Sequence, residues 1–223
     1  MVVAFSGGLD TSFTVMYLAK EKGYEVYAAC ANTGGFSPEQ LKTNEENAYK
    51  LGAKEYVTID VTQEYYEKSL RYMVFGNVLR NGTYPISVSS ERIFQALAIA
   101  RYANEIGADA IAHGSTGAGN DQIRFELTIK ALAPHLQIIA AWRDDKWTLQ
   151  SREDEIQYLI DRGLEVPMKK EDSYSRDSNI WHISHEGLDL EDPANEPKFD
   201  SLLKLGVSPE QAPDKPTYVS ITI

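Results

Sequence analysis

The sequence is short of cysteine, of positive charge and of long apolar runs. Its 223 residues include one cysteine, Cys30, which excludes an internal disulfide, a cysteine-based zinc cage and a pair of catalytic thiols within this chain. Lys and Arg total 22 against 33 Asp and Glu, a formal net charge of -11. A field of this sign repels nucleic acids and anionic membranes. Any phosphate site must therefore be local.

No apolar stretch approaches the roughly 20 residues of a membrane-spanning helix. The first apolar stretch, Met1–Phe5, lacks the basic region and the length of a signal peptide. A lone cysteine is typical of proteins in a reducing compartment. We therefore expect a cytoplasmic protein with no nucleic-acid partner and no membrane partner.

Short apolar runs alternate with segments of helical spacing, the pattern of β-α-β units around a parallel sheet. The runs predict strands that are covered on both faces, at Val2–Phe5, Glu25–Ala31, Glu55–Val61, Ala108–His113 and Leu136–Ala140. Segments with helical spacing predict five helices, most of which end at or near a glycine. They are expected from Phe13 to Gly23, Pro38 to Gly52, Gln63 to Phe75, Ser90 to Ile106 and Ser151 to Gly163. We expect an α/β fold with a doubly wound, mostly parallel sheet.

Two of these helices carry more specific signals. Ser37-Pro38-Glu39-Gln40 predicts a capping box, with serine at the N-cap and proline at the first helical position. In the long fourth helix, Ile93, Leu97, Ala100 and Ala103 share one stripe, which predicts the face that packs on the core.

A glycine-rich loop, Ser6 to Ser12, follows the first strand. Its two glycines let the backbone approach an anion, its hydroxyls can donate hydrogen bonds, and the N-terminus of the next helix adds N–H groups and a favourable dipole. The loop therefore predicts a phosphate site, although it is neither a Walker A loop nor a dinucleotide fingerprint. The alternative is an ordinary strand-to-helix turn capped by Asp10 or Thr11.

A second polar loop occupies residues 113–126 and follows another predicted strand. Arg124 offers a planar cation for a carboxylate, Asn120 and Thr116 offer neutral donors, and Asp121 can accept from an ammonium group. This set suits a zwitterionic amino acid. The alternative is a glycine-rich turn in which Asn120 and Asp121 are caps and Arg124 pairs with Glu126 or solvent.

Ser6-Gly7-Gly8-Leu9-Asp10-Thr11 resembles the PP-loop of the ATP pyrophosphatases. Residues 114–125 resemble the signature Gly-x-Thr-Gly-x-Gly-Asn-Asp-x-x-Arg-Phe of the argininosuccinate synthase family. Tyr84–Ser89, Tyr174–Ser184 and Leu190–Pro193 resemble further segments of that family in the same order. The resemblance covers nearly the whole chain.

The resemblance implies a PP-loop, Rossmann-like fold of the adenine nucleotide alpha hydrolase type and an AMP-forming ligase that joins citrulline and aspartate. The ureido oxygen of citrulline would attack the α-phosphate of ATP, and the aspartate amine would then displace AMP. The cofactors implied are ATP and Mg²⁺, with Mg²⁺ held by phosphate and water and not by a protein ligand. A homotetramer is implied for the full-length protein.

The resemblance also implies roles for individual residues. ATP would be bound by Ala4, Phe5, Ser6, Gly7, Gly8, Leu9, Asp10, Thr11, Ser12, Ala31 and Gly114. Aspartate would be bound by Thr116, Asn120 and Asp121, and citrulline by Tyr84, Ser89, Asn120, Arg124, Ser175 and Ser184. Catalytic roles would fall to Asp10, Asn120 and Arg124. Ala118 departs from the family, which has lysine there, so one cation near the phosphates is missing.

The sequence leaves two other functions open. A tRNA-modifying PP-loop enzyme that transfers sulfur would need catalytic thiols, and Cys30 falls on a predicted buried strand. A non-catalytic adenine-nucleotide-binding module would have no reason to keep the amino-acid-matching second loop. The spacing of His113, His182 and His185 matches no standard metal site, which favours structural roles for these histidines.

The composition and the periodicity of the sequence change after Gly163. Residues 164–217 hold six of the nine prolines and show no sustained period. We expect a nucleotide-binding domain at residues 1–163, followed at residues 164–223 by an irregular excursion and the truncated start of a second, α+β domain. Tyr218–Ile223 alternates like a strand, so we expect the natural polypeptide to continue beyond it.

Overall fold

A computed structural model of the chain describes residues 1–115, 120–140, 143, 152–164 and 174–222. The chain divides into two units, which are described separately. The first unit comprises Met1–Pro167 and Ser178–His182, and the second comprises Met168–Asp177 and Ile183–Ile223. The domains 1–163 and 164–223 remain predictions.

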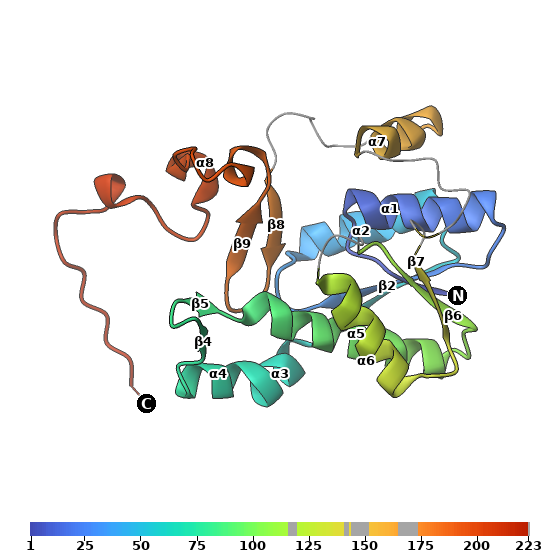
Figure 1. The fold of residues 1–223 in the computed structure, drawn as a ribbon, viewed down its shortest axis with the longest axis horizontal. Coiled ribbons are helices and arrows are strands. Elements are labelled where there is room, and N and C mark those ends of the chain that lie inside the picture. The colour runs from blue at the N-terminus through green and yellow to red at the C-terminus, as the bar shows by residue number, and fades with distance from the viewer. Residues whose placement is uncertain (116–119, 141–142, 144–151, 165–173, 223) are drawn as a thin grey trace. The chain divides into compact units, whose positions relative to one another are not determined.

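The first unit is built on a parallel sheet of five strands in the order β3-β2-β1-β6-β7 (Figure 1). The strands are β1 (Val2–Ala4), β2 (Tyr27–Asn32), β3 (Glu55–Asp60), β6 (Ala110–His113) and β7 (Gln137–Ala140). All five predicted strands are confirmed in order, with ends that lie at most two residues from the predicted ones. In the register of the central strand, Ala4 lies opposite Ala29 of β2 and His113 of β6.

Helices cover both faces of this sheet, which confirms the doubly wound α/β fold (Figure 1). One face carries α1 (Leu9–Met16), α2 (Pro38–Leu51) and α7 (Arg152–Asp161), and the other carries α5 (Ser87–Glu105) and α6 (Asp121–Leu132). The remaining elements of the unit are a π-helical turn at Tyr17–Glu21, α3 (Thr62–Tyr65), a second π-helical turn at Tyr66–Leu70, α4 (Arg71–Phe75), and the hairpin β4 (Leu79–Arg80) and β5 (Tyr84–Pro85). None of the helices in the described part of the chain has the length and apolar character needed to cross a bilayer.

The ends of α2 follow directly from the local sequence. Ser37 Oγ accepts a hydrogen bond from the backbone N–H of Gln40 at 3.2 Å, and the Gln40 side chain accepts one from the Ser37 N–H at 2.8 Å. The helix stops at Gly52, which has φ +104°, a conformation that glycine adopts without a steric penalty. The predicted capping box is confirmed.

The predicted core face of α5 is partly wrong. Ile93 is 48% exposed, whereas the buried face is formed by Ala96, Ile99, Ala100 and Ala103. The helix begins at Ser87, three residues earlier than predicted, and its first two turns bury the polar residues Ser87 and Glu91. A polar face is therefore buried at the start of α5, and hydrophobic spacing cannot reveal this.

The second unit contains less regular structure. Its elements are β8 (Ser175–Ser178), whose last residue is counted with the first unit, its partner β9 (Ile183–Glu186), α8 (Phe199–Leu202), and 3-10 turns at Leu188–Glu191 and Pro209–Gln211. The strand predicted at Tyr218–Ile223 is not formed within residues 218–222, where Tyr218, Val219 and Ile221 are exposed. Alternation supplies a side-chain pattern, but a strand also requires a hydrogen-bonding neighbour.

Candidate functional site

The loop between β1 and α1 is shaped by a glycine that no other residue can replace without strain. Gly7 has φ +78°, and a Cβ added to it would collide with the side-chain oxygen of Asn44 from α2. The Asn44 amide in turn donates a hydrogen bond to the carbonyl of Ser6 at 3.2 Å. The conformation of the loop is therefore fixed by its contact with Asn44 of α2.

Asn44 was not singled out by the sequence analysis. It is a polar residue on an otherwise apolar face of α2, and only 8% of it is exposed. A buried amide must find hydrogen-bond partners, so its position in the apolar stripe was a signal that it supports a neighbouring loop.

Hydroxyl groups of the same loop hold one another. Thr11 Oγ1 donates to the carbonyl of Gly8 at 3.1 Å and lies 3.2 Å from Ser6 Oγ. Thr14 Oγ1 donates to the carbonyl of Asp10 at 2.7 Å. The backbone N–H groups in the first turn of α1 have no intrahelical acceptor, as in any helix. The loop thus combines fixed hydroxyls with a helix N-terminus, the arrangement suited to a phosphate.

The two glycine-rich loops meet at the carboxyl ends of neighbouring strands. Because β1 and β6 pair with Ala4 opposite His113, Gly114 emerges beside the first loop. A Cβ added to Gly114 would lie 3.1 Å from the backbone nitrogen and from Cγ2 of Thr11. The second loop therefore starts in direct contact with the first turn of α1.

The remaining predicted ATP residues occupy the same edge of the sheet in different ways. The side chains of Phe5 and Leu9 are buried, so only their backbone can face a ligand. Ala31 lies near the carboxyl end of β2 and packs partly against the core. Ser12 belongs to the first turns of α1.

At the start of α6, Asp121 is held between two guanidinium groups. Its Oδ1 accepts a hydrogen bond from Arg124 Nη1 at 2.7 Å, and its Oδ2 accepts one from Arg92 Nε at 2.9 Å. Burial raises the pKa of Asp121, but the charges and hydrogen bonds of Arg92 and Arg124 outweigh burial, so this pKa lies below its usual value. Asp121 is therefore a carboxylate near neutral pH, able to accept from an ammonium group.

The structure overturns the alternative pairing of Arg124. Its carboxylate partner is Asp121, whereas Glu126 accepts hydrogen bonds from Arg143 at 2.7 Å and from Gln122 at 3.2 Å. Asn120 occupies the N-cap position of α6 without a side-chain cap hydrogen bond.

Arg92 was missed by the sequence analysis. It lies on α5, one turn after Ser89 and outside the hydrophobic stripe predicted for that helix. An arginine close to the polar Tyr84–Ser89 segment was the available signal.

Other predicted substrate residues are placed less completely. Thr116 lies outside the described residues, as does Ala118. Tyr84 is exposed on β5, and Ser89 is half-buried on α5. Ser175 and Ser184 belong to the second unit, in β8 and β9.

The histidines do not form a metal site in the described part of the chain. His113 is buried at the end of β6, and its Nε2 lies 3.7 Å from Glu126 Oε1, beyond hydrogen-bond distance. Burial lowers the pKa of His113, with a further lowering from Arg143 that the Glu126 carboxylate opposes. His182 is hydrogen-bonded to Ser87, and burial lowers the pKa of His185. His113 therefore carries no charge near neutral pH, and Ser87 gives His182 a structural contact.

Cys30 is a buried residue of β2. Burial raises the pKa of its thiol to about 11. Since the thiolate is the reactive form, this cysteine is inert packing and offers no nucleophile.

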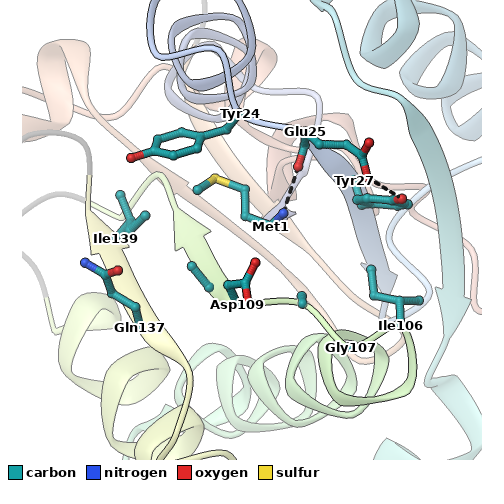
Figure 2. A pocket seen from close by; sticks show the side chains of 11 residues that line it. Met1, Tyr24, Glu25, Tyr27, Ile106, Gly107, Asp109, Gln137 and Ile139 are labelled. Carbon is teal, nitrogen blue, oxygen red and sulfur yellow. Dashed lines mark hydrogen bonds between the residues drawn. The ribbon is translucent and has the colours of Figure 1, made fainter.

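A cavity of about 270 Å³ lies away from these loops, at the amino ends of the strands (Figure 2). There the Met1 ammonium donates to the carbonyl of Glu25 at 2.7 Å, and the Tyr27 hydroxyl donates to the Glu25 carboxylate at 2.8 Å. No residue predicted to bind a substrate lines this cavity. Open parallel sheets bind ligands at the carboxyl ends of their strands, where the two loops are.

A five-stranded parallel sheet with covered faces and two glycine-rich loops in contact at its carboxyl edge defines an α/β protein of the PP-loop, Rossmann-like class. Residues 1–165 match the family described as the arginosuccinate synthase N-terminal HUP domain. The chain therefore belongs to the argininosuccinate synthase family.

Curated relatives agree with this assignment. The argininosuccinate synthase of Lachnospira eligens is 48% identical over 222 residues, which are 100% of this chain and 54% of that protein. The argininosuccinate synthase of Acetivibrio thermocellus is 48% identical over 221 residues, with 99% and 54% covered. The chain thus spans about half the length of the curated relatives it matches. The solved structure of NMN synthetase from Francisella tularensis aligns with a TM-score of 0.40 at 16% identity, over 52% of this chain and 44% of that one.

Proposed function

We propose that this protein supplies the nucleotide-binding part of an ATP-dependent, AMP-forming ligase that joins L-citrulline and L-aspartate to give argininosuccinate, a step of arginine biosynthesis. The observation that carries the proposal is the contact between Gly114 and the first turn of α1, because it brings the phosphate loop and the amino-acid loop to one edge of the sheet. Membership of the argininosuccinate synthase family supports the choice of substrates.

ATP would lie along the carboxyl edge of the sheet. The N–H groups and dipole at the N-terminus of α1, together with the hydroxyls of Ser6, Thr11 and Ser12, would hold its phosphates. The backbone from Ala4 to Leu9 and the start of the second loop at Gly114 would flank them, with Ala31 on the adenine side. Mg²⁺ would enter with ATP, bound by phosphate and water oxygens.

The two amino acids would use the ion-paired residues of α5 and α6. Asp121, kept ionised by Arg92, would accept a hydrogen bond from the ammonium group of aspartate. Thr116 and Asn120 would act as neutral donors to the same substrate. Arg124 would exchange part of its contact with Asp121 for the carboxylate of citrulline, a bidentate partner well matched to guanidinium. Tyr84, Ser89, Asn120, Ser175 and Ser184 complete the citrulline contacts.

The reaction would need little acid–base chemistry from the protein. The ureido oxygen of citrulline attacks the α-phosphorus, a P–O bond forms, the bond to the α,β-bridging oxygen breaks, and pyrophosphate leaves. The aspartate amine then attacks the activated ureido carbon, a C–N bond forms, the C–O bond to AMP breaks, and the amine proton passes to solvent. Positioning and charge neutralisation by the backbone of the loop, Asp10, Asn120 and Arg124 would supply most of the rate enhancement.

The oligomeric state and the location of the protein belong to the same proposal. A homotetramer is proposed for the full-length protein, on the strength of the family alone. A cytoplasmic location is proposed because the single cysteine is a free, buried thiol and because ATP is the co-substrate.

Exchange of labelled pyrophosphate into ATP tests this function. On the full-length protein, exchange should require citrulline and should not require aspartate. Exchange that depends on tRNA and ignores citrulline would assign the protein to the tRNA-modifying enzymes. ATP binding without any exchange would make it a non-catalytic nucleotide-binding module.

A further inference from the structure

Residues 178–182 belong to the first unit, although the residues on either side of them in the sequence belong to the second. The N–H of Ile180 donates to the carbonyl of Thr33 at 2.9 Å, just beyond the end of β2. A Cβ added to Gly34 would collide with the Ile180 side chain, and one added to Gly35 would collide with the carbonyl oxygen of Ser178. The segment is therefore anchored on the loop after β2, at the carboxyl edge of the sheet.

A buried carboxylate holds this anchored segment in place. Glu91 of α5 is 2% exposed, and three hydrogen-bond donors converge on it. Its Oε1 accepts from Thr33 Oγ1 at 2.5 Å and from Gln95 Nε2 at 2.8 Å, and its Oε2 accepts from Asn179 Nδ2 at 2.9 Å. One side chain thus joins the end of β2, the helix α5 and the anchored segment.

Asn179 extends the network into the segment itself. Its Oδ1 accepts from the N–H groups of Trp181 at 2.9 Å and His182 at 3.2 Å. The His182 ring is within 2.9 Å of Ser87 Oγ, in the first turn of α5. The backbone of residues 179–182 is therefore shaped by the same side chain that binds Glu91.

We propose that Glu91 is a positioning residue for citrulline, an inference that rests on the proposed function. Ser89 lies two residues before Glu91 on α5, and the next residue, Arg92, binds Asp121. In the sequence the anchored segment stands between the two other predicted citrulline residues, three residues after Ser175 and two before Ser184. Glu91 thus fixes the start of α5, which carries Ser89, together with the anchored segment, and it would act without touching the substrate.

The substitution Glu91→Gln gives a direct test. It keeps the shape but replaces one acceptor oxygen by a donor, so the amide of Asn179 would face another amide N–H₂ group. Asn179→Asp alone places a second carboxylate against Glu91, which is also mismatched. The double variant Glu91→Gln/Asn179→Asp restores a donor facing an acceptor, with the two roles exchanged.

The readouts are the KM values for citrulline and for ATP of the full-length protein, with hydrogen exchange of the Ile180 N–H as a measurement that does not depend on activity. Each single variant should raise the citrulline KM about tenfold, leave the ATP KM within about twofold and speed exchange at Ile180, because a buried polar group is left mismatched. The double variant should recover most of both losses. Glu67→Gln, the same change on an exposed side chain bonded to Gln63, should leave every value unchanged.

Equal changes in the two KM values, no change in either, or no recovery in the double variant would overturn the role of Glu91. If the single variants do not fold, Thr33→Val removes one donor to Glu91 at nearly constant volume, and it should raise the citrulline KM severalfold with the ATP KM unchanged. A wild-type protein without citrulline-dependent exchange would instead overturn the proposed function.

Discussion

Arg124 donates a hydrogen bond to Asp121 Oδ1 at 2.7 Å, so two residues expected to bind different amino acids bind each other. Arg92 occupies the other oxygen of the same carboxylate at 2.9 Å. The opposite charges of the two side chains thus balance each other. In the proposed function, a substrate carboxylate would replace Asp121 at Arg124, while Arg92 would continue to balance the charge of Asp121.

Replacing Arg124 by alanine should raise the citrulline KM at least tenfold and change the ATP KM by less than about twofold. A charge-assisted hydrogen bond to a carboxylate contributes about 1.5–3 kcal/mol, which corresponds to a loss of this size or larger. Steady-state kinetics with each substrate varied in turn measure the effect. Arg101→Ala, on an exposed arginine paired with Glu64, is the control and should be silent. Equal losses for citrulline and ATP would indicate that Arg124 stabilises the fold.

Replacing Arg92 by alanine should raise the aspartate KM about tenfold. The variant leaves the partly buried Asp121 with one guanidinium, so its pKa rises toward the value that burial favours and its position is less fixed. Arg92→Lys keeps a positive charge but lacks the planar guanidinium, so its aspartate KM should lie between those of the wild type and Arg92→Ala. The aspartate KM and the citrulline KM are compared in the same preparations. An unchanged aspartate KM in Arg92→Ala would contradict a role for Asp121 in binding the aspartate amine.

Gly7→Ala should destabilise the protein by about 2–4 kcal/mol, because it combines a left-handed φ with a collision against Asn44. Gly7→Ala/Asn44→Ala removes the collision and should be more stable than Gly7→Ala alone. Gly23→Ala is the matched control: φ is +69° there, nothing lies within 4 Å of an added Cβ, and the cost should be about 1–2 kcal/mol. Urea unfolding gives the free energies. A Gly7→Ala cost equal to that of Gly23→Ala would mean that Asn44 does not shape the loop.

Gly114→Ala should weaken ATP binding about tenfold with a smaller effect on stability. The new Cβ would lie 3.1 Å from the Thr11 nitrogen, tight enough to displace the first turn of α1 by a few tenths of an ångström. Calorimetric titration with ATP measures the loss. Gly206→Ala, where nothing lies within 4 Å of the added Cβ, should bind ATP normally. Unchanged binding by Gly114→Ala would separate the second loop from the nucleotide site.

The free energy of unfolding should fall between about pH 7 and about pH 5.5, and His113 should account for much of the fall. Burial lowers the pKa of His113 in the folded protein, so the unfolded chain takes up the proton first and acidification favours unfolding. Asp121 contributes below this window, because its lowered pKa matters only as the pH drops through its ordinary value of 3.8.

His113→Gln should flatten this pH dependence, which denaturant titrations at several pH values would reveal. The pKa of His185 is also lowered, so this residue too makes the protein less stable on acidification. The pH dependence of His185→Gln is therefore compared with that of His113→Gln. A slope that is the same in wild type and His113→Gln would show that Glu126 compensates for the burial of His113.

The local parts of the fold could be predicted from the sequence. Strand-forming runs, the Ser37 capping box and the glycine-rich turn between β1 and α1 depend on a few consecutive residues, and the structure has each of them at the predicted position. The pairing of Asp121 with Arg124 is local as well, since the two residues lie one turn apart on α6, but it was not predicted: the sequence left Arg124 to a substrate carboxylate, to Glu126 or to solvent.

The long-range parts could not be predicted. Glu91 and Asn179 are 88 residues apart in the sequence, and although Asn179 falls within the Tyr174–Ser184 segment, nothing local pairs it with Glu91. Arg92 and Asp121 come from two helices whose contact depends on how both pack against the sheet. The exposure of Ile93 has the same cause. At the start of α5 the buried face is formed by the polar residues Ser87 and Glu91, whereas hydrophobic spacing predicted that Ile93 would be buried there.

The fate of the citrulline ureido oxygen tests the central claim most directly. Full-length protein is incubated with ATP, aspartate and citrulline labelled with ¹⁸O in the ureido group, and the AMP formed is analysed by mass spectrometry. Attack of the ureido oxygen on the α-phosphorus predicts that the label appears in the phosphate of AMP. Unlabelled AMP formed together with argininosuccinate, or ADP in place of AMP, would contradict the proposed adenylation.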